Sequence, residues 1–278
     1  KSVPITIRLI LGRGWGQGPT HSQNLQSWFA HIPGLKVVAP SNPEDAYNLL
    51  NFSINDKNPV IFLEHRWLHY SKAKKLKKFN KQNSKFLPKA KITKNGKDIT
   101  IVASSYLVSE AIKAHEILIK ENIFCEIIDL RFIKPIDWKT IIKSVNKTKR
   151  LIVLDPGYSF ASVASEIITK IITENNVNFK SKPVKLAMPD IHEPTSYNLT
   201  KDYYTDYLKI IYKIGDMFNR TPGFINSLGY SVDDTTPWDI DEGTQLPKAI
   251  DVEVSFTHIG RHKLASQGKH YDLPWLRP

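Results

Sequence analysis

Apolar residues recur along the chain in two alternating patterns, and these patterns predict its secondary structure. Short apolar runs of strand length are separated by stretches in which apolar residues return every three or four positions, as on one face of a helix. In the first part of the chain the runs at 3–9, 35–39 and 60–64 predict strands, with a helix between the second and the third. We expect this helix to begin with a capping box, because Ser41 and Glu44 have the required spacing. Strand, helix and strand in this order predict a βαβ unit.

The same alternation returns after residue 97 with greater regularity. Strands are predicted at 99–103, 124–130, 151–154 and 184–188, with helical spacing between them and a closing helix over 203–218. Repeated strand and helix units with almost uninterrupted apolar strands indicate a parallel sheet covered by helices on both faces. The expected fold class is therefore α/β, with two domains that each contain a mainly parallel sheet flanked by helices.

A lysine-rich segment separates the two regions. Residues 72–97 contain eleven lysines and no acidic residue, so they supply +11 of the formal net charge of +12. The segment lacks a sustained apolar period, which predicts an exposed linker. A solvated tether is the first interpretation and a docking strip for an acidic partner the second; nucleic acid is disfavoured because no binding motif accompanies the lysines. The expected domains are 1–71, the linker 72–97, 98–219, and an irregular extension over 220–278.

The composition narrows the class of protein. The 278 residues are enough for one large or two ordinary domains, and 41% hydrophobic and 24% charged residues are typical of a soluble globular protein. No apolar run approaches the ~20 residues needed to cross a bilayer, and no signal peptide is evident, so no membrane association is expected. The single cysteine, Cys125, cannot form an internal disulfide, which suits a reducing cytoplasm.

His21 is the first candidate for chemistry. Alternating glycines at positions 12, 14, 16 and 18 precede it, but they match neither a dinucleotide fingerprint nor a P-loop. Ligands in open α/β sheets bind beyond the carboxyl ends of the strands, and His21 follows a predicted strand through this glycine-rich loop. Imidazole is suited to proton transfer near neutral pH. From these residues alone, a turn histidine bonded to backbone stays an equal alternative.

The other histidine pairs are weaker candidates. His65 and His69, like His258 and His262, are four positions apart, which on a helix places two ligands on one face. Neither pair lies in a recognised zinc motif or has an evident third ligand. Metal binding by these pairs is therefore not favoured.

The apolar run at 124–130 contains two further features. Cys125 lies inside it and is expected to be a packed small hydrophobe and not a nucleophile. Asp129 and Arg131, at its end, are candidates for an exposed ion pair at a domain or subunit contact. A purely structural role is the default for both residues.

An ordered set of runs resembles the beta subunit of the thiamine diphosphate-dependent 2-oxoacid dehydrogenases, of the pyruvate and branched-chain type. The first half contributes His21-Ser22-Gln23 and residues 31–38, 40–41 and 58–64. The second half contributes residues 129–131, 135–137 and 144–151, which are similar to a transketolase-type C-terminal domain. The resemblance implies that 1–71 is the back part of a transketolase-like pyrimidine-binding domain, incomplete on its N-terminal side, and that 98–219 is the C-terminal domain.

The resemblance also implies a function. Enzymes of this family use thiamine diphosphate to decarboxylate a 2-oxoacid oxidatively and pass the acyl group to a lipoyl carrier. The chain would be one subunit of such an oxidoreductase, with His21 assisting proton or acyl transfer. An alpha-type subunit would hold the diphosphate and Mg²⁺, a lipoyl acyltransferase core would be a further partner, and the beta-type chain would self-associate through its C-terminal domain in a heterotetramer.

The same resemblance implies a structural potassium site but assigns no other cofactor-binding residue. The site is built largely from backbone carbonyls, and hard oxygen ligands suit such a cation. By unbroken spacing its members would be Ile5, Ser53, Ile54, Asp56 and Asn58.

The chain also departs from the family pattern. The glutamate that activates the aminopyrimidine would lie upstream of the first strand, so we expect an active site that is incomplete without partners. Asp155-Pro156-Gly157 stands where the family often has glutamate and a glycine pair. Two alternatives therefore stay open: a non-catalytic scaffold or dimerisation half with the same fold, and a transketolase-like transferase.

Overall fold

The computed structural model describes residues 2–12, 17–72, 88–196, 199–200, 203–204, 207–217, 223–231, 238–241, 244–247 and 251–258. The chain divides into two compact units, Lys1–Ile214 and Gly215–Pro278. Among the described residues, no helix combines the length and the apolar character needed to span a membrane.

The first unit contains two sheets, of which the first has the strand order β1-β3-β2-β7. Its strands are β1 (Thr6–Leu11), β2 (Lys36–Val38), β3 (Val60–His65) and β7 (Phe132–Lys134). The first three strands are parallel, whereas β7 is antiparallel to β2. The accompanying helices are α1 (Gly18–His21), α2 (Gln26–His31), α3 (Pro43–Ile54) and the 3-10 turn η1 (Arg66–Leu68).

The start of α3 differs from the predicted capping box. Asn42 is the N-cap, because its side chain accepts a hydrogen bond from the backbone N–H of Asp45 at 2.9 Å. Asparagine is as good a cap as serine, and Pro43 fits the first helical position. Ser41 instead donates its hydroxyl proton to Asp129 at 2.5 Å. The prediction was therefore wrong by one residue, because Ser41 is used in a long-range contact.

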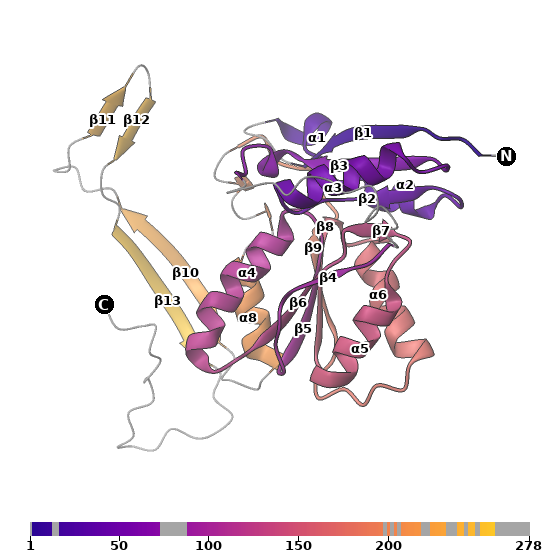
Figure 1. The fold of residues 1–278 in the computed structure, drawn as a ribbon. Helices are drawn as coiled ribbons and strands as arrows, with labels where there is room; N and C mark the ends of the chain where they lie inside the picture. The colour runs from indigo at the N-terminus through magenta and orange to yellow at the C-terminus, as the bar shows by residue number, and fades with distance from the viewer. Residues whose placement is uncertain are drawn as a thin grey trace. The chain divides into compact units, whose positions relative to one another are not determined.

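The second sheet has the order β4-β6-β5-β8-β9, and all of its strands except β4 run parallel. They are β4 (Lys91–Lys94), β5 (Ile99–Ala103), β6 (Cys125–Asp129), β8 (Leu151–Tyr158) and β9 (Val184–Met188). The helices are α4 (Leu107–Leu118), η3 (Ile119–Glu121), α5 (Trp138–Thr148), α6 (Val163–Glu174) and α8 (Tyr207–Met217). Figure 1 shows α4 on one face of the sheet and α5 and α6 on the other. The expected α/β class, with two mainly parallel sheets, is confirmed.

Two predicted segments contain strands that the sequence did not reveal. Edge strand β4 lies inside the predicted linker 72–97, of which residues 73–87 are outside the described part. The predicted irregular extension over 220–278 contains two antiparallel pairs. One pair is β10 (Gly223–Ser231) with β13 (Asp251–His258), and the other is β11 (Trp238–Asp241) with β12 (Thr244–Pro247). Strand β13 does alternate apolar Val252, Val254 and Phe256 with polar residues, a strand signal that the prediction overlooked. Strands β11 and β12 have four residues each, which is too few to establish a period.

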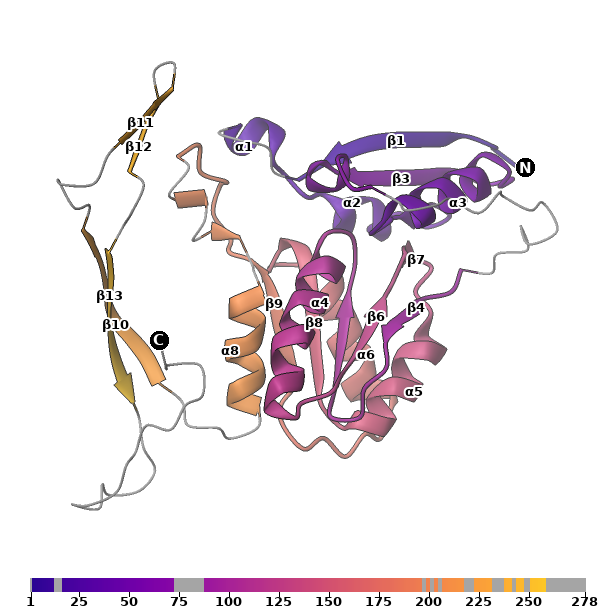
Figure 2. The same ribbon diagram turned by 60° about the vertical axis from the view of Figure 1, so that its left-hand side comes forward.

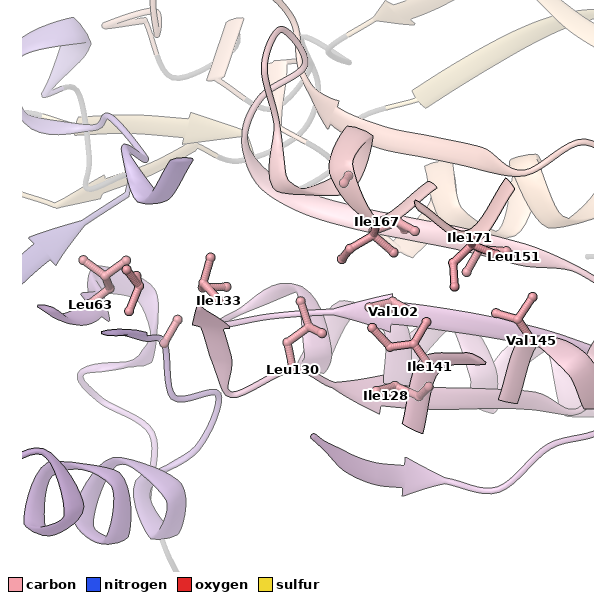
Figure 3. Close-up of a cluster of buried hydrophobic side chains, with 14 of the residues drawn as sticks. Leu63, Val102, Ile128, Leu130, Ile133, Ile141, Val145, Leu151, Ile167 and Ile171 are labelled. Carbon is pink, nitrogen blue, oxygen red and sulfur yellow. The ribbon is translucent and has the colours of Figure 1, made fainter. Parts of the chain in front are cut away.

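One hydrophobic core joins the two sheets of the first unit. Its buried residues include Val37 and Leu63 from the first sheet and Val102, Ile128 and Val153 from the second. Figure 3 shows Leu63 and Ile133 at one end of this cluster and Val145 near the other. Burial of each such side chain is worth ~1.5–3 kcal/mol relative to exposure. The two sheets are therefore held together by apolar packing as well as by β7, which follows β6 in sequence but pairs in the first sheet.

A buried polar cluster reinforces this junction. Asp129 at the end of β6 accepts hydrogen bonds from the Ser41 hydroxyl and, at 3.0 Å, from the backbone N–H of Arg131. The Arg131 guanidinium donates to Asp45 of α3 at 3.2 Å and to the carbonyl oxygen of Lys89 at 2.7 Å. Asp129 and Arg131, expected to form an exposed ion pair, are both buried, and the Arg131 guanidinium forms its ion pair with Asp45 of α3 instead.

Candidate functional site

The candidate site lies where the carboxyl ends of strands from both sheets meet. Leu11 ends β1, His65 ends β3, Ser104 and Ser105 follow β5, and Pro156 belongs to β8; all of them line one small cavity. Carboxyl edges of parallel strands are where open α/β sheets bind ligands. The helix α1 lies just beyond the end of β1 in Figure 2. The structure therefore places the segment that begins at His21 at this edge.

His21 is exposed, whereas residues 22–26, which follow it in the chain, are buried or half buried. It ends α1, and its side chain is exposed, whereas Ser22, Asn24 and Gln26 are each at most 4% exposed. The carbonyl oxygen of Gln23 accepts the N–H of Gly12 at 3.1 Å, which ties the segment to the end of β1. An imidazole held in this way reaches solvent while its neighbours are fixed in the protein.

Asp155 anchors the same segment from the second sheet. Its Oδ1 accepts hydrogen bonds from Gln26 Nε2 at 2.5 Å and from the N–H of Gly157 at 2.9 Å. Its Oδ2 accepts the N–H of Ala164, in the first turn of α6, at 2.9 Å. Burial raises the pKa of Asp155, although these hydrogen bonds act in the opposite direction. The sequence had left the role of this position open.

His65 is a packed residue at the inner wall of the site. Its Nδ1 accepts the backbone N–H of Trp67 at 3.2 Å, which assigns the ring proton to Nε2. Its ring stacks on Tyr106 with centroids 4.2 Å apart. A Cβ at Gly12 would lie 2.0 Å from Nε2, so only glycine fits there, at a φ of +76°.

The two histidine pairs differ in what the structure describes of them. His65 is buried at the end of β3, while His69 is exposed after η1, so they do not share a helix face. His258 ends β13, and His262 lies outside the described residues. Within the described part of the chain there is also no group of three or more His, Cys, Asp or Glu suited to holding a metal ion.

Asn24 and Gln26 line the cavity, and three of their buried amide atoms have no hydrogen-bond partner among the described residues. They are Oδ1 and Nδ2 of Asn24 and Oε1 of Gln26. Ser105, which also lines the cavity, has a φ of 55°, a left-handed conformation that serine rarely adopts. Strained backbone of this kind is common at functional sites. Asn24, Gln26 and Ser105 were missed from the sequence, because isolated polar residues carry no periodic signal.

The structure brings the predicted potassium residues to one corner of the first sheet. Ser53 and Ile54 end α3, and Asp56 and Asn58 lie in the loop to β3. Pairing of β1 with β3 adds Ile5, whose carbonyl oxygen accepts the N–H of Val60 at 2.9 Å. A carbonyl has a second lone pair, and the last carbonyls of a helix carry its negative dipole end. The backbone carbonyl oxygens of this corner are the ligand type that a hard cation prefers, whereas the Asp56 carboxylate is already paired with the Lys36 ammonium group.

A wide surface hollow of about 1110 Å³ lies beside the site, between α2, the turn before α5 and the start of α6. Trp28 and Phe160 border it and are 69% and 80% exposed. Large aromatic side chains at this level of exposure are enriched where proteins meet partners.

Comparisons with known proteins agree with this architecture. Residues 2–70 match the transketolase pyrimidine binding domain, and residues 88–210 match the transketolase C-terminal domain. The chain is 41% identical over 203 residues to the pyruvate dehydrogenase E1 component subunit beta-1, mitochondrial, of Oryza sativa subsp. japonica, covering 72% of this chain and 54% of that protein. It is 40% identical to the pyruvate dehydrogenase E1 component subunit beta of Rickettsia bellii, covering 71% of this chain and 60% of that protein.

A solved structure shares the fold. It is described as a split gene transketolase, inactive beta4 tetramer, and has a TM-score of 0.64 at 18% identity, covering 78% of this chain and 67% of that one. The chain spans about half the length of the plant relative.

Proposed function

The chain belongs to the family that joins a transketolase pyrimidine-binding domain to a transketolase C-terminal domain, and we propose that it acts as the beta-type subunit of a thiamine diphosphate-dependent pyruvate dehydrogenase or a related 2-oxoacid dehydrogenase. The observation that carries this proposal is the ~40% identity to E1 beta subunits across both domains. Branched-chain 2-oxoacids are the alternative substrate class.

His21 is the proposed catalytic residue. When bound, thiamine diphosphate supplies the carbanion and the electron sink for decarboxylation. The His21 imidazole is exposed at the carboxyl edge of the parallel strands, where it can hold or move a proton at a ring nitrogen during acyl transfer. The buried residues that follow it keep the imidazole at that edge.

The proposed active site is completed by partners. An alpha-type subunit would supply the residues for the diphosphate and Mg²⁺, and a lipoyl acyltransferase core would receive the acyl group. We propose that the chain self-associates through its C-terminal domain in a heterotetramer, and that it is located in the cytoplasm.

Affinity capture of the chain from its native extract tests this assignment. Recovery of a stoichiometric alpha-type subunit with a diphosphate-binding domain is the expected result. Recovery of the chain as a homo-oligomer alone would favour the scaffold alternative, a non-catalytic half with the same fold.

We also propose that potassium binds at the corner formed by Ile5, Ser53, Ile54, Asp56 and Asn58. A cation that binds only the folded state raises stability with its concentration. Exchanging K⁺ for tetramethylammonium at equal ionic strength is therefore expected to lower the unfolding temperature by several degrees, measured by calorimetry. Equal unfolding temperatures in the two salts would remove the site.

A further inference from the structure

Gln26 ties the segment that carries His21 to the other domain. It begins α2, five residues after His21, and its Nε2 donates to Asp155, 129 positions further along the chain, at 2.5 Å. Both side chains are buried, at 2% and 3% exposure. A hydrogen bond to a buried carboxylate is stronger than one between neutral groups. This contact therefore fixes where the segment leaves the first sheet.

Asp155 is itself held rigidly, so it can serve as an anchor. Besides Gln26, it accepts the N–H of Gly157 and, at the start of α6, the N–H of Ala164. The N-terminal N–H groups of a helix favour a carboxylate in this place. A displacement of Gln26 would thus break its hydrogen bond to Asp155, while the Asp155 carboxylate stays held by Gly157 and Ala164.

Gly157 lies so close to Gln26 and Asn24 that a side chain at this position would collide with them. A Cβ at this position would lie 2.5 Å from Gln26 Nε2 and 3.1 Å from the carbonyl oxygen of Asn24. Side-chain and backbone atoms of the segment therefore touch the Gly157 backbone, and no larger residue fits without moving the segment. Asn24 and Gln26 of this segment also line the small cavity at the carboxyl ends of the strands.

We infer that Asp155 and Gly157 are positioning residues that clamp Asn24 and Gln26 and thereby hold the exposed His21 at the carboxyl edge of the first sheet. The inference rests on the proposed function for the chemistry of His21, but the clamp itself is a property of this chain. Because the two halves of the clamp come from different domains, the position of His21 depends on the junction between them.

Two variants test the clamp, with a matched control. Gln26→Leu removes the donor at similar volume, and Gly157→Ala adds a methyl group at the contact. Gly215→Ala is the control, because a Cβ there would meet nothing within 4 Å. Hydrogen exchange of the backbone, followed by mass spectrometry on the full chain, compares peptides over 18–25 with peptides over β5.

Both clamp variants are expected to raise exchange at 18–25 by about tenfold or more, while β5 and the control stay at wild-type rates. In the assembled enzyme they are expected to lower kcat by about tenfold or more and to change KM for the 2-oxoacid by less than about threefold, because a misplaced catalytic group affects the reaction more than binding. If Gly157→Ala fails to fold, Gln26→Leu alone decides, since it removes only one hydrogen bond.

The outcomes separate this inference from the proposed function. Unchanged exchange at 18–25 in Gln26→Leu would overturn the clamp, whatever the activity. Raised exchange with unchanged kcat would show that the segment is held but that His21 needs no positioning, which also overturns the inference. Raised exchange in both clamp variants, together with a wild-type complex that shows no thiamine-dependent turnover, would leave the clamp standing and remove the proposed function.

Discussion

Replacing His21 with alanine tests the proposed catalytic residue, because its side chain is exposed and its removal leaves the buried part of the segment intact. Loss of a proton-transfer group lowers turnover by ~10²-fold or more. We expect this loss for His21→Ala in the assembled enzyme, with an unchanged unfolding temperature. The exposed His69 offers a matched control, and His69→Ala should keep full turnover. Near-normal turnover of His21→Ala would exclude the histidine from the mechanism.

Asp129 should make the stability of the protein depend on pH near neutrality. Burial raises its pKa to about 7, and the neighbouring Asp45 adds to the effect, while Ser41 and Arg131 oppose it. Lys91 is the other charged group of the cluster, 4.0 Å from Asp45. Because an unfolded aspartate titrates near pH ~3.9, the folded chain holds a proton that the unfolded chain releases. The stabilisation that proton binding at Asp129 contributes is therefore fully present below pH ~3.9 and is lost as the pH rises through about 7.

Denaturant unfolding between pH 5 and pH 8 measures this effect. The free energy of unfolding of the wild type is expected to fall over this range by ~2 kcal/mol or more relative to Asp129→Asn, which carries no titrating group at this position. If the wild type and Asp129→Asn showed the same pH dependence, Asp129 would not be the group that titrates near neutral pH.

At the scale of elements, the buried ion pair between Asp45 of α3 and Arg131, the residue before β7, should contribute more to stability than an exposed ion pair. Removing Arg131 leaves the buried Asp45 without its guanidinium partner, a change that costs about 3 kcal/mol or more. Arg8 makes two hydrogen bonds of 2.9 Å to Glu64 between β1 and β3, but its side chain is 58% exposed. Such a pair is worth less than ~1 kcal/mol. Chemical unfolding of Arg131→Ala and Arg8→Ala is expected to give this order, and equal losses would refute it.

The regular elements were predictable, whereas the contacts between them were not. The strands predicted at 99–103 and 184–188 agree with β5 and β9, because mainly apolar runs of strand length that alternate with helical spacing carry a clear local signal. Strand β7 was missed since three residues are too few for a period, and β4 was hidden in a lysine-rich stretch. The bond from Gln26 to Asp155 depends on packing between domains, which no local pattern encodes. His21 was identified through resemblance, and its anchor only through the structure.

At the scale of the molecule, the two sheets of the first unit share a hydrophobic core, and among the described residues buried polar contacts also join them, while β7 follows β6 in sequence but pairs in the first sheet. Ser41 and Asp45 meet Asp129 and Arg131 on one side of the junction, and Gln26 meets Asp155 on another. A change at this junction therefore reaches both the stability of the fold and the segment that carries His21. The function proposed for the chain depends on this shared construction.

The most direct test of the central claim is CO₂ release from a carboxyl-labelled 2-oxoacid by the complex captured with the wild-type chain, measured with and without added thiamine diphosphate and Mg²⁺. We expect CO₂ release that requires the cofactor and is highest with pyruvate or a branched-chain 2-oxoacid. A complex saturated with cofactor that releases no CO₂ from either class would contradict the assignment as a dehydrogenase subunit.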